Sequence, residues 1–197
     1  RHTASGTSTL TVGVGDTSST YGGTIKDGDA GMTLALTKIG VGTLTLSGVN
    51  SSDGPQHVSG GTLALSGGAF LTNSAVITVA SNAVLDVSGL SSPFTLAQAL
   101  GSQTLSNSAP GAILSGTNNC TTGRLSLVAD GVNPAFIQTN GTMTISAGTM
   151  ITVNNLGAPL AAGHHPLITA VTMGSPGQVT GALPPVTVTG NGADGTA

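Results

Sequence analysis

The chain has 197 residues, of which only 6% are charged and 2% aromatic, and its formal net charge is −3. Globular domains carry about 25% charged residues, and helices rely on Glu, which is absent here, and on Lys and Arg, which total four. The composition therefore excludes an α-rich fold. It also excludes nucleic-acid binding, because so few cations and aromatic rings cannot follow a phosphate backbone or stack bases.

Short runs of alternating apolar and hydroxyl residues recur along the chain, bounded by Gly, Asn, Ser or Asp. This alternation predicts strands, with Leu and Val on one face and Thr and Ser on the other. In chain order, the predicted strands are residues 8–12, 33–36, 43–46, 62–65, 75–79, 84–87, 124–128, 142–145, 150–153 and 186–189. Disorder is excluded because 38% of the residues are hydrophobic.

Residues 92–100 are the one segment that also fits a helix. Pro93 suits the start of a helix and Gly101 its end. However, Phe94, Leu96 and Leu100 also lie at even spacing, so we favour strand or irregular structure over a helix.

The sequence repeats itself. Residues 42–48 recur 19 residues later as residues 61–67, with six of seven positions identical, and residues 84–89 are a looser third copy. Coils of about 20 residues that stack on one another explain this period. The scarcity of charge agrees with stacking, since like charges would face each other every ~4.8 Å. The pattern predicts an all-β solenoid of about nine or ten coils, roughly 45 Å long.

We expect a single β-solenoid over residues 1–197, with its clearest repeats at 30–90 and a less regular continuation over 120–197. A β-sandwich is the alternative, because it also uses many short strands and Gly-rich turns. It does not call for a near-exact 19-residue repeat, so the solenoid is favoured, most clearly within residues 30–90.

The central segment resembles the autotransporter-associated β-strand repeat, also called the passenger-associated repeat, of bacteria. The resemblance lies in Lys38, in residues 40–50 (Gly-Val-Gly-Thr-Leu-Thr-Leu-Ser-Gly-Val-Asn) and in residues 58–63 (Val-Ser-Gly-Gly-Thr-Leu). The usual turn between these parts is replaced by residues 51–57. The resemblance implies a right-handed parallel β-helix, export to the bacterial cell surface or beyond, and a stalk-like, adhesive or fibre-forming role. The chain is then expected to be a piece of a longer exported protein.

Candidate chemical groups are few. The acids are Asp16, Asp27, Asp29, Asp53, Asp86, Asp130 and Asp194. Asp27 and Asp29, beside Lys26, could form a carboxylate pair or a weak Ca²⁺ site, but a turn held by its own hydrogen bonds is the favoured interpretation. Asp86 lies in a predicted strand and is expected to face solvent.

The histidines, the cysteine and a glycine-rich motif are also interpreted as parts of the fold and not as functional sites. His164 and His165 are adjacent and lack a third ligand at a suitable spacing, so a metal site is not favoured. Cys120 has no nearby His in the sequence and is expected to be a small buried residue; as the single cysteine, it excludes an internal disulfide. Residues 190–195 match Gly-x-Gly-x-x-Gly but precede no helix, so they are interpreted as a turn. We therefore expect no catalytic, cofactor-binding or metal-binding residues.

Two classes of function follow. The first is a non-enzymatic, extracellular building block of a surface fibre, sheath or adhesin stalk, which associates end to end into filaments or tandem arrays through exposed strand edges. The second is a secreted carbohydrate-binding or carbohydrate-cleaving β-helix, with a surface glycan as partner. It ranks lower, because Tyr21, Phe70, Phe94 and Phe136 do not recur at coil spacing. An ice-binding solenoid is a weaker third hypothesis, because the Thr runs are irregular. We expect no membrane insertion within this segment.

Overall fold

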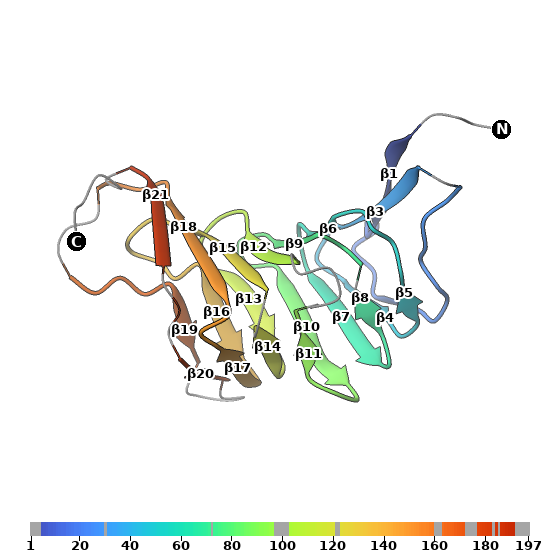
Figure 1. The fold of residues 1–197 in the computed structure, drawn as a ribbon. Helices are drawn as coiled ribbons and strands as arrows, with labels where there is room; N and C mark the ends of the chain where they lie inside the picture. Colours follow the sequence, from blue (N-terminus) through green and yellow to red (C-terminus); the bar gives the residue numbers. More distant parts are fainter. Residues whose placement is uncertain are drawn as a thin grey trace.

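The computed structural model describes residues 5–29, 31–71, 73–96, 103–120, 123–159, 163–171, 177–182, 184 and 186–191. In these residues every strand pair is parallel, and the chain winds as a β-helix whose strands form long sheets along an elongated rod (Figure 1). The prediction of an all-β parallel solenoid is confirmed. The segment 92–100 contains a short strand at its described part, and residues 97–100 lie outside the described residues.

The first sheet runs the whole length of the rod. In spatial order its strands are β1 (Gly6–Val12), β3 (Met32–Lys38), β6 (Gln56–Val58), β9 (Val76–Val79), β12 (Thr104–Asn107), β15 (Arg124–Ala129), β18 (Met150–Asn155) and β21 (Val186–Gly190). The outermost strands, β1 and β21, lie at opposite ends of the molecule (Figure 1).

The second sheet forms another side of the helix. Its strands are β2 (Ser19–Tyr21), β4 (Thr43–Leu46), β7 (Thr62–Gly67), β10 (Val84–Leu90), β13 (Ala112–Ser115), β16 (Phe136–Thr139) and β19 (Ile168–Ala170). On the third side, β5 (Val49–Asn50) pairs with β8 (Phe70–Leu71), and further along the rod a separate sheet contains β11 (Phe94–Thr95), β14 (Asn118–Cys120), β17 (Gly141–Ile145) and β20 (Gly177–Gly181).

The number of coils differs from the prediction of nine or ten. The first sheet has eight strands in the described part of the chain, so the solenoid has eight rungs there. The discrepancy arises because coil length varies. The step from Leu36 to its partner Gln56 is 20 residues, whereas the step from Ile151 to Val186 is 35. The repeat near residues 42–67 is clear because the coil there is short, with 19 residues from Thr43 to its partner Thr62.

The core is a set of stacked apolar columns. Leu44, Leu63, Leu85 and Leu114 face one another in successive strands of the second sheet, and all are buried. The alternate positions point outward, where Thr43 pairs with Thr62. The predicted stacking of Leu inside and Thr outside is confirmed, and the 19-residue repeat corresponds to two adjacent rungs.

The first sheet carries an outward column of mostly hydroxyl residues. It consists of Thr11, Thr37, His57, Thr78, Ser106, Ser126, Thr152 and Thr187. Thr78 and Ser106 share a hydrogen bond of 2.9 Å between their hydroxyl oxygens. His57 thus belongs to strand β6, whereas the sequence placed it in a turn.

Glycine is needed where the chain turns between the first and second sheets. Gly40 and Gly61 have φ angles of +70° and +59° in adjacent coils. A Cβ atom on Gly61 would collide with the carbonyl oxygen of Gly42. Stacked turns therefore bring backbone against backbone with no room for a side chain, which helps to explain the high glycine content.

Polar side chains that point into the β-helix donate hydrogen bonds to backbone carbonyls at these turns. Asn107 ends strand β12 and donates hydrogen bonds to the carbonyls of Ala109, in its own turn, and of Val128, in the next coil, both at 2.8 Å. Asn155 ends strand β18 in the same way and binds the carbonyls of Ala158 and Asn191. Each amide therefore ties a turn to the equivalent place in the next coil.

Lys38 makes the same connection with a charged group. It ends strand β3, is 1% exposed, and donates from Nζ to the carbonyls of Ile39 (2.7 Å), Gly40 (3.0 Å) and Gly60 (3.2 Å). Burial lowers the pKa of Lys38 from its ordinary value, while the nearby carboxylate of Asp16 opposes this shift. The three carbonyls supply the polar contacts that a buried cation requires.

We predict that Leu63→Ala lowers the free energy of unfolding by about 2–5 kcal/mol, because it leaves a cavity between Leu44 and Leu85. Thr62→Ala, its neighbour on the outer face, should change this free energy by about 0.5 kcal/mol or less. Urea titration followed by circular dichroism measures both. Equal effects of the two substitutions would contradict the assignment of inner and outer faces.

We predict that Lys38→Met destabilises the protein by about 2–4 kcal/mol, because Met fills a similar space but leaves three turn carbonyls without their donor. Lys26→Met, at an exposed position, is the matched control and should have little effect. Thermal denaturation compares the two variants. A Lys38→Met protein as stable as the parent would show that the ammonium group is dispensable.

Candidate functional site

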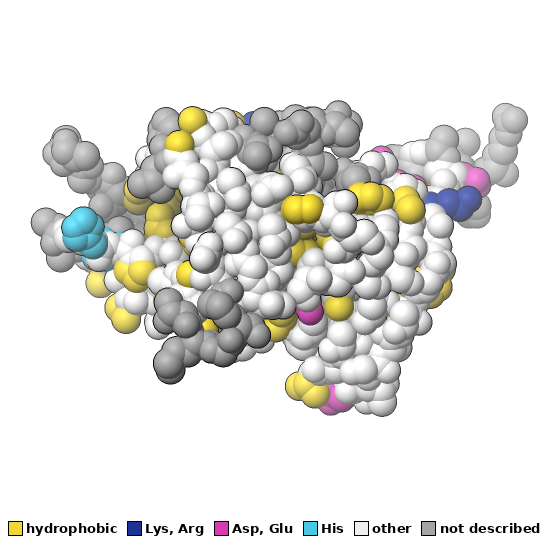
Figure 2. Space-filling model, turned by 90° about the horizontal axis from the view of Figure 1, so that it is seen from below, with side chains coloured by type: hydrophobic (Ala, Val, Ile, Leu, Met, Phe, Trp, Pro, Cys, Tyr) yellow, Lys and Arg dark blue, Asp and Glu magenta, His cyan; other side chains and the backbone are white. Residues whose placement is uncertain are grey.

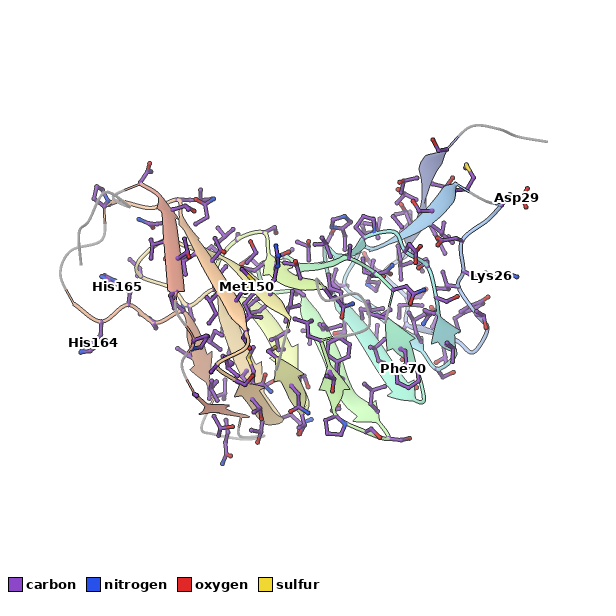
Figure 3. All side chains as sticks on the ribbon, viewed as in Figure 1. Lys26, Asp29, Phe70, Met150, His164 and His165 are labelled. Atoms are coloured by element: carbon purple, nitrogen blue, oxygen red, sulfur yellow. The ribbon has the colours of Figure 1, made fainter. Side chains whose placement is uncertain are left out.

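Near the start of the chain, the carboxylate of Asp27 accepts hydrogen bonds from the backbone of neighbouring segments. Asp27 accepts hydrogen bonds from the backbone N–H of Leu34 (2.7 Å) and of Asp53 (3.0 Å), so it links the segment between β2 and β3 to strand β3 and to the next coil. Asp29 and Lys26 point outward at this end of the molecule (Figure 3). The expected turn held by its own hydrogen bonds is not found at residues 26–28, and the hydrogen bonds of the Asp27 carboxylate go to strand β3 and to the next coil instead.

The other described acids are also separate from one another. Asp16 accepts a hydrogen bond from the N–H of Val41, and Asp86 one from the N–H of Ser88. Asp86 faces outward, as predicted. Asp130 accepts hydrogen bonds from Asn133 and Val132, and these lower the pKa of its carboxyl group. Asp194 lies outside the described residues.

The histidines do not converge. His164 and His165 lie in the segment between β18 and β19 and point to different sides of it (Figure 3). His165 Nδ1 lies 3.2 Å from the carbonyl oxygen of Gly131, within hydrogen-bonding distance. Within the described ranges, no group of three or more His, Cys, Asp or Glu residues could hold a metal ion.

Cys120 is buried in strand β14, with 2% of its surface exposed. Burial in apolar surroundings raises the pKa of its thiol from 9.0 to about 12. A thiol that stays protonated at neutral pH is a poor nucleophile. The interpretation of Cys120 as a small core residue is confirmed.

The aromatic residues do not form a row on one face. Phe94 and Phe136 are core residues, with 8% and 0% of their surface exposed, while Phe70 is 50% and Tyr21 45% exposed. Phe70 lies on the third side of the helix and Tyr21 in the edge strand of the second sheet. A sugar-binding face built from stacked rings is therefore not assembled by these four residues.

Side chains on the long face seen in Figure 2 are largely uncharged. Acidic and basic groups are scattered over it and do not form a patch of one sign. Among the described residues there is also no helix of the length and apolar character needed to cross a bilayer.

The two ends of the rod are the most distinctive surfaces. At the N-terminal end, strand β1 is solvent-exposed along almost its whole length, and its inward-facing Leu10 is 41% exposed. At the C-terminal end, the inward-facing Val186 and Val188 of strand β21 are 44% and 42% exposed. In the rungs between them, the equivalent side chains are buried. Apolar side chains that point inward are therefore partly exposed at both ends of the rod.

The N-terminal end is also hollow. A cavity of about 440 Å³ opens there, with Leu10, Val12, Tyr21, Ile25, Leu36 and Leu46 among its lining residues. It forms because Ser19 occupies the position that Leu44 and Leu63 take in the next two rungs of the second sheet. The small side chain leaves the first coil underfilled.

Sequence reasoning predicted the C-terminal strand and named Lys38 as part of the repeat pattern, but it missed the burial of Lys38 and this hollow. Lys38 could have been found, because it follows Met32, Leu34 and Leu36 at even spacing and must therefore point inward. The hollow depends on the pairing of Ser19 with Leu44, and no pattern within residues 19–21 reveals that register.

Comparison with known families agrees with this architecture. Residues 36–65 match the family model of the passenger-associated-transport-repeat, in agreement with the resemblance found in the sequence. The matched segment runs from the second half of β3 into β7, which is one complete coil and part of the next. The chain thus carries a repeat found in autotransporter passenger proteins, which suggests a secreted or surface location. No curated protein and no solved structure matches the chain.

We predict that Cys120 does not react with a thiol reagent at pH 8 in the folded protein and reacts fully in denaturant. Because folding raises the pKa of this thiol, protonated Cys120 contributes stability that is present below pH 9 and declines as the pH rises towards 12. Labelling with and without urea measures the first effect, and unfolding at pH 8 and pH 11 measures the second, with Cys120→Ala as the control. Rapid labelling of the folded protein would contradict the burial of Cys120.

Proposed function

We propose that this chain is a non-enzymatic, extracellular structural module: a β-solenoid building block of a bacterial surface fibre, sheath or adhesin stalk that associates end to end. The observation that carries the proposal is the pair of edge strands β1 and β21, which lie at opposite ends of one sheet (Figure 1). Strand edges of this kind recruit further strands unless they are blocked.

Three further observations support the proposal. Residues 36–65 match the passenger-associated-transport-repeat, and the resemblance to this repeat implies export from a bacterial cell. Neither β1 nor β21 contains a charged residue, although charge is a common device for preventing edge-to-edge association. Finally, the carboxylates of Asp16, Asp27, Asp86 and Asp130 accept hydrogen bonds from backbone N–H groups, so these acids have structural roles in the fold.

Negative-stain microscopy and light scattering of the 197-residue chain test this function. We expect filaments or oligomers whose mass rises with protein concentration. Val188→Lys should reduce association, because it places a charge on the half-exposed apolar end. Phe70→Lys is the matched control, since Phe70 is 50% exposed on the side of the rod, and it should associate like the parent.

A monomer at all concentrations would contradict the end-to-end function. Turnover of a polysaccharide by the purified chain would contradict its non-enzymatic character and favour the carbohydrate-active alternative.

A further inference from the structure

A corner in the middle of the rod carries extra residues. Asp86 of β10 pairs with Ser115 of β13, and Phe94 of β11 pairs with Asn118 of β14. Seven residues lie between Asp86 and Phe94, whereas two lie between Ser115 and Asn118. The longer connection forms a corner loop, residues 87–93, at the lower edge of the rod (Figure 1).

The corner loop follows the preceding coil and leaves a cleft towards the coils after it. Past a bulge in β10, Leu90 pairs with Gly67 of β7, and the N–H of Ser91 donates a hydrogen bond of 2.8 Å to the carbonyl of Gly67. On the other side, β10 pairs with β13 only as far as Asp86. A cleft of about 300 Å³ lies between the loop and the next two coils. Because it is formed by neighbouring coils of one chain, coils added at either end of the rod would leave it open.

The polar lining of this cleft is uncharged and has free hydrogen-bonding capacity. It consists of four hydroxyl groups and one amide, from Ser88, Ser91, Ser92, Thr117 and Asn140. All five residues are exposed, and in the described part of the chain none of their side chains forms a hydrogen bond. Leu90 and Pro93 add apolar surface beside them. Sites for small ligands commonly combine apolar surface with a few convergent polar groups.

This lining restricts the chemistry of a ligand. Hydroxyl and amide groups both donate and accept hydrogen bonds, so a matching ligand carries several groups that do the same. A charged ligand would lose water without gaining a counter-charge from the described lining residues. A sugar ring satisfies both conditions, because its hydroxyl groups donate and accept while its C–H face can contact Leu90 and Pro93.

We propose that the cleft beside the corner loop binds a neutral saccharide, with Thr117 and Asn140 among its hydrogen-bonding partners. The inference adds a recognition site on the side of the rod and does not depend on end-to-end association. A peptide strand fits less well, because the part of β10 beyond its pairing with β13 is only Val87–Leu90, which is too short for an added strand to form a ladder of hydrogen bonds.

The backbone at Asn140 permits a clean test. Its φ angle is +47°, in the left-handed region that glycine adopts without strain. Asn140→Gly therefore removes the amide and keeps the backbone conformation. Asn82 is the matched control: it is also exposed, has a φ of +60°, and lies in the turn between β9 and β10, outside the cleft. Thr117→Val is a second cleft variant, which removes a hydroxyl group from an exposed residue at nearly constant shape.

Binding is measured first on an array of neutral and sialylated oligosaccharides, and then by calorimetry with the neutral oligosaccharide that gives the strongest signal. We expect neutral glycans to bind the parent chain. Asn140→Gly and Thr117→Val should each weaken binding about tenfold, as expected for the loss of one hydrogen bond to the ligand. Asn82→Gly should bind within about twofold of the parent, and circular dichroism confirms that each variant is folded.

Three results would overturn the inference. The first is that no neutral oligosaccharide binds at about 1 mM. The second is a preference for sialylated glycans, which contradicts the uncharged lining. The third is that both cleft variants bind as tightly as the parent, which places the site elsewhere. Because the same chain is assayed for association separately, each of these results leaves the end-to-end function standing.

Discussion

The rungs of a parallel β-helix lie about 4.8 Å apart, and this spacing decides what each residue can face. A side chain meets the residue at the same position in the coil before and the coil after. Apolar residues therefore form continuous columns, as Leu44, Leu63 and Leu85 do. The same spacing brings turns close together, so their carbonyls need partners from inside. Lys38, Asn107 and Asn155 supply these partners.

The strands that sequence reasoning predicted are those whose inner positions are aliphatic. In β4 and β7 the alternation of Thr and Leu is direct evidence of two faces. Several strands that it missed carry polar or small residues inside. Strand β14 reads Asn-Asn-Cys, yet Asn118 and Cys120 are buried, and strand β6 places Gln56 in the column between Leu36 and Ile77. Such amides bind backbone within the helix, so their polarity conceals the alternation.

The functional surfaces were predictable only in part. The exposed strand Val186–Gly190 could be identified from its sequence, because it is short, uncharged and alternating. The exposed edge at β1 could not be identified from the sequence, because it depends on the strand register. This register pairs Leu10 with Leu36 and Ser19 with Leu44. Coil length could not be predicted either. Extra residues in a turn lengthen a coil, but its strands still stack on the same columns of side chains.

The direction of the strand-to-strand hydrogen bonds has a mechanical consequence. These bonds run along the rod, and the described chain begins and ends at opposite ends of it (Figure 1). A force that pulls the two ends apart would therefore load one rung at a time, beginning at an end, instead of shearing many bonds together. Each coil released would lengthen the chain by about 65–125 Å, at roughly 3.3–3.6 Å per residue for steps of 20 to 35 residues. A stalk built in this way would yield gradually under tension and absorb work as it extends.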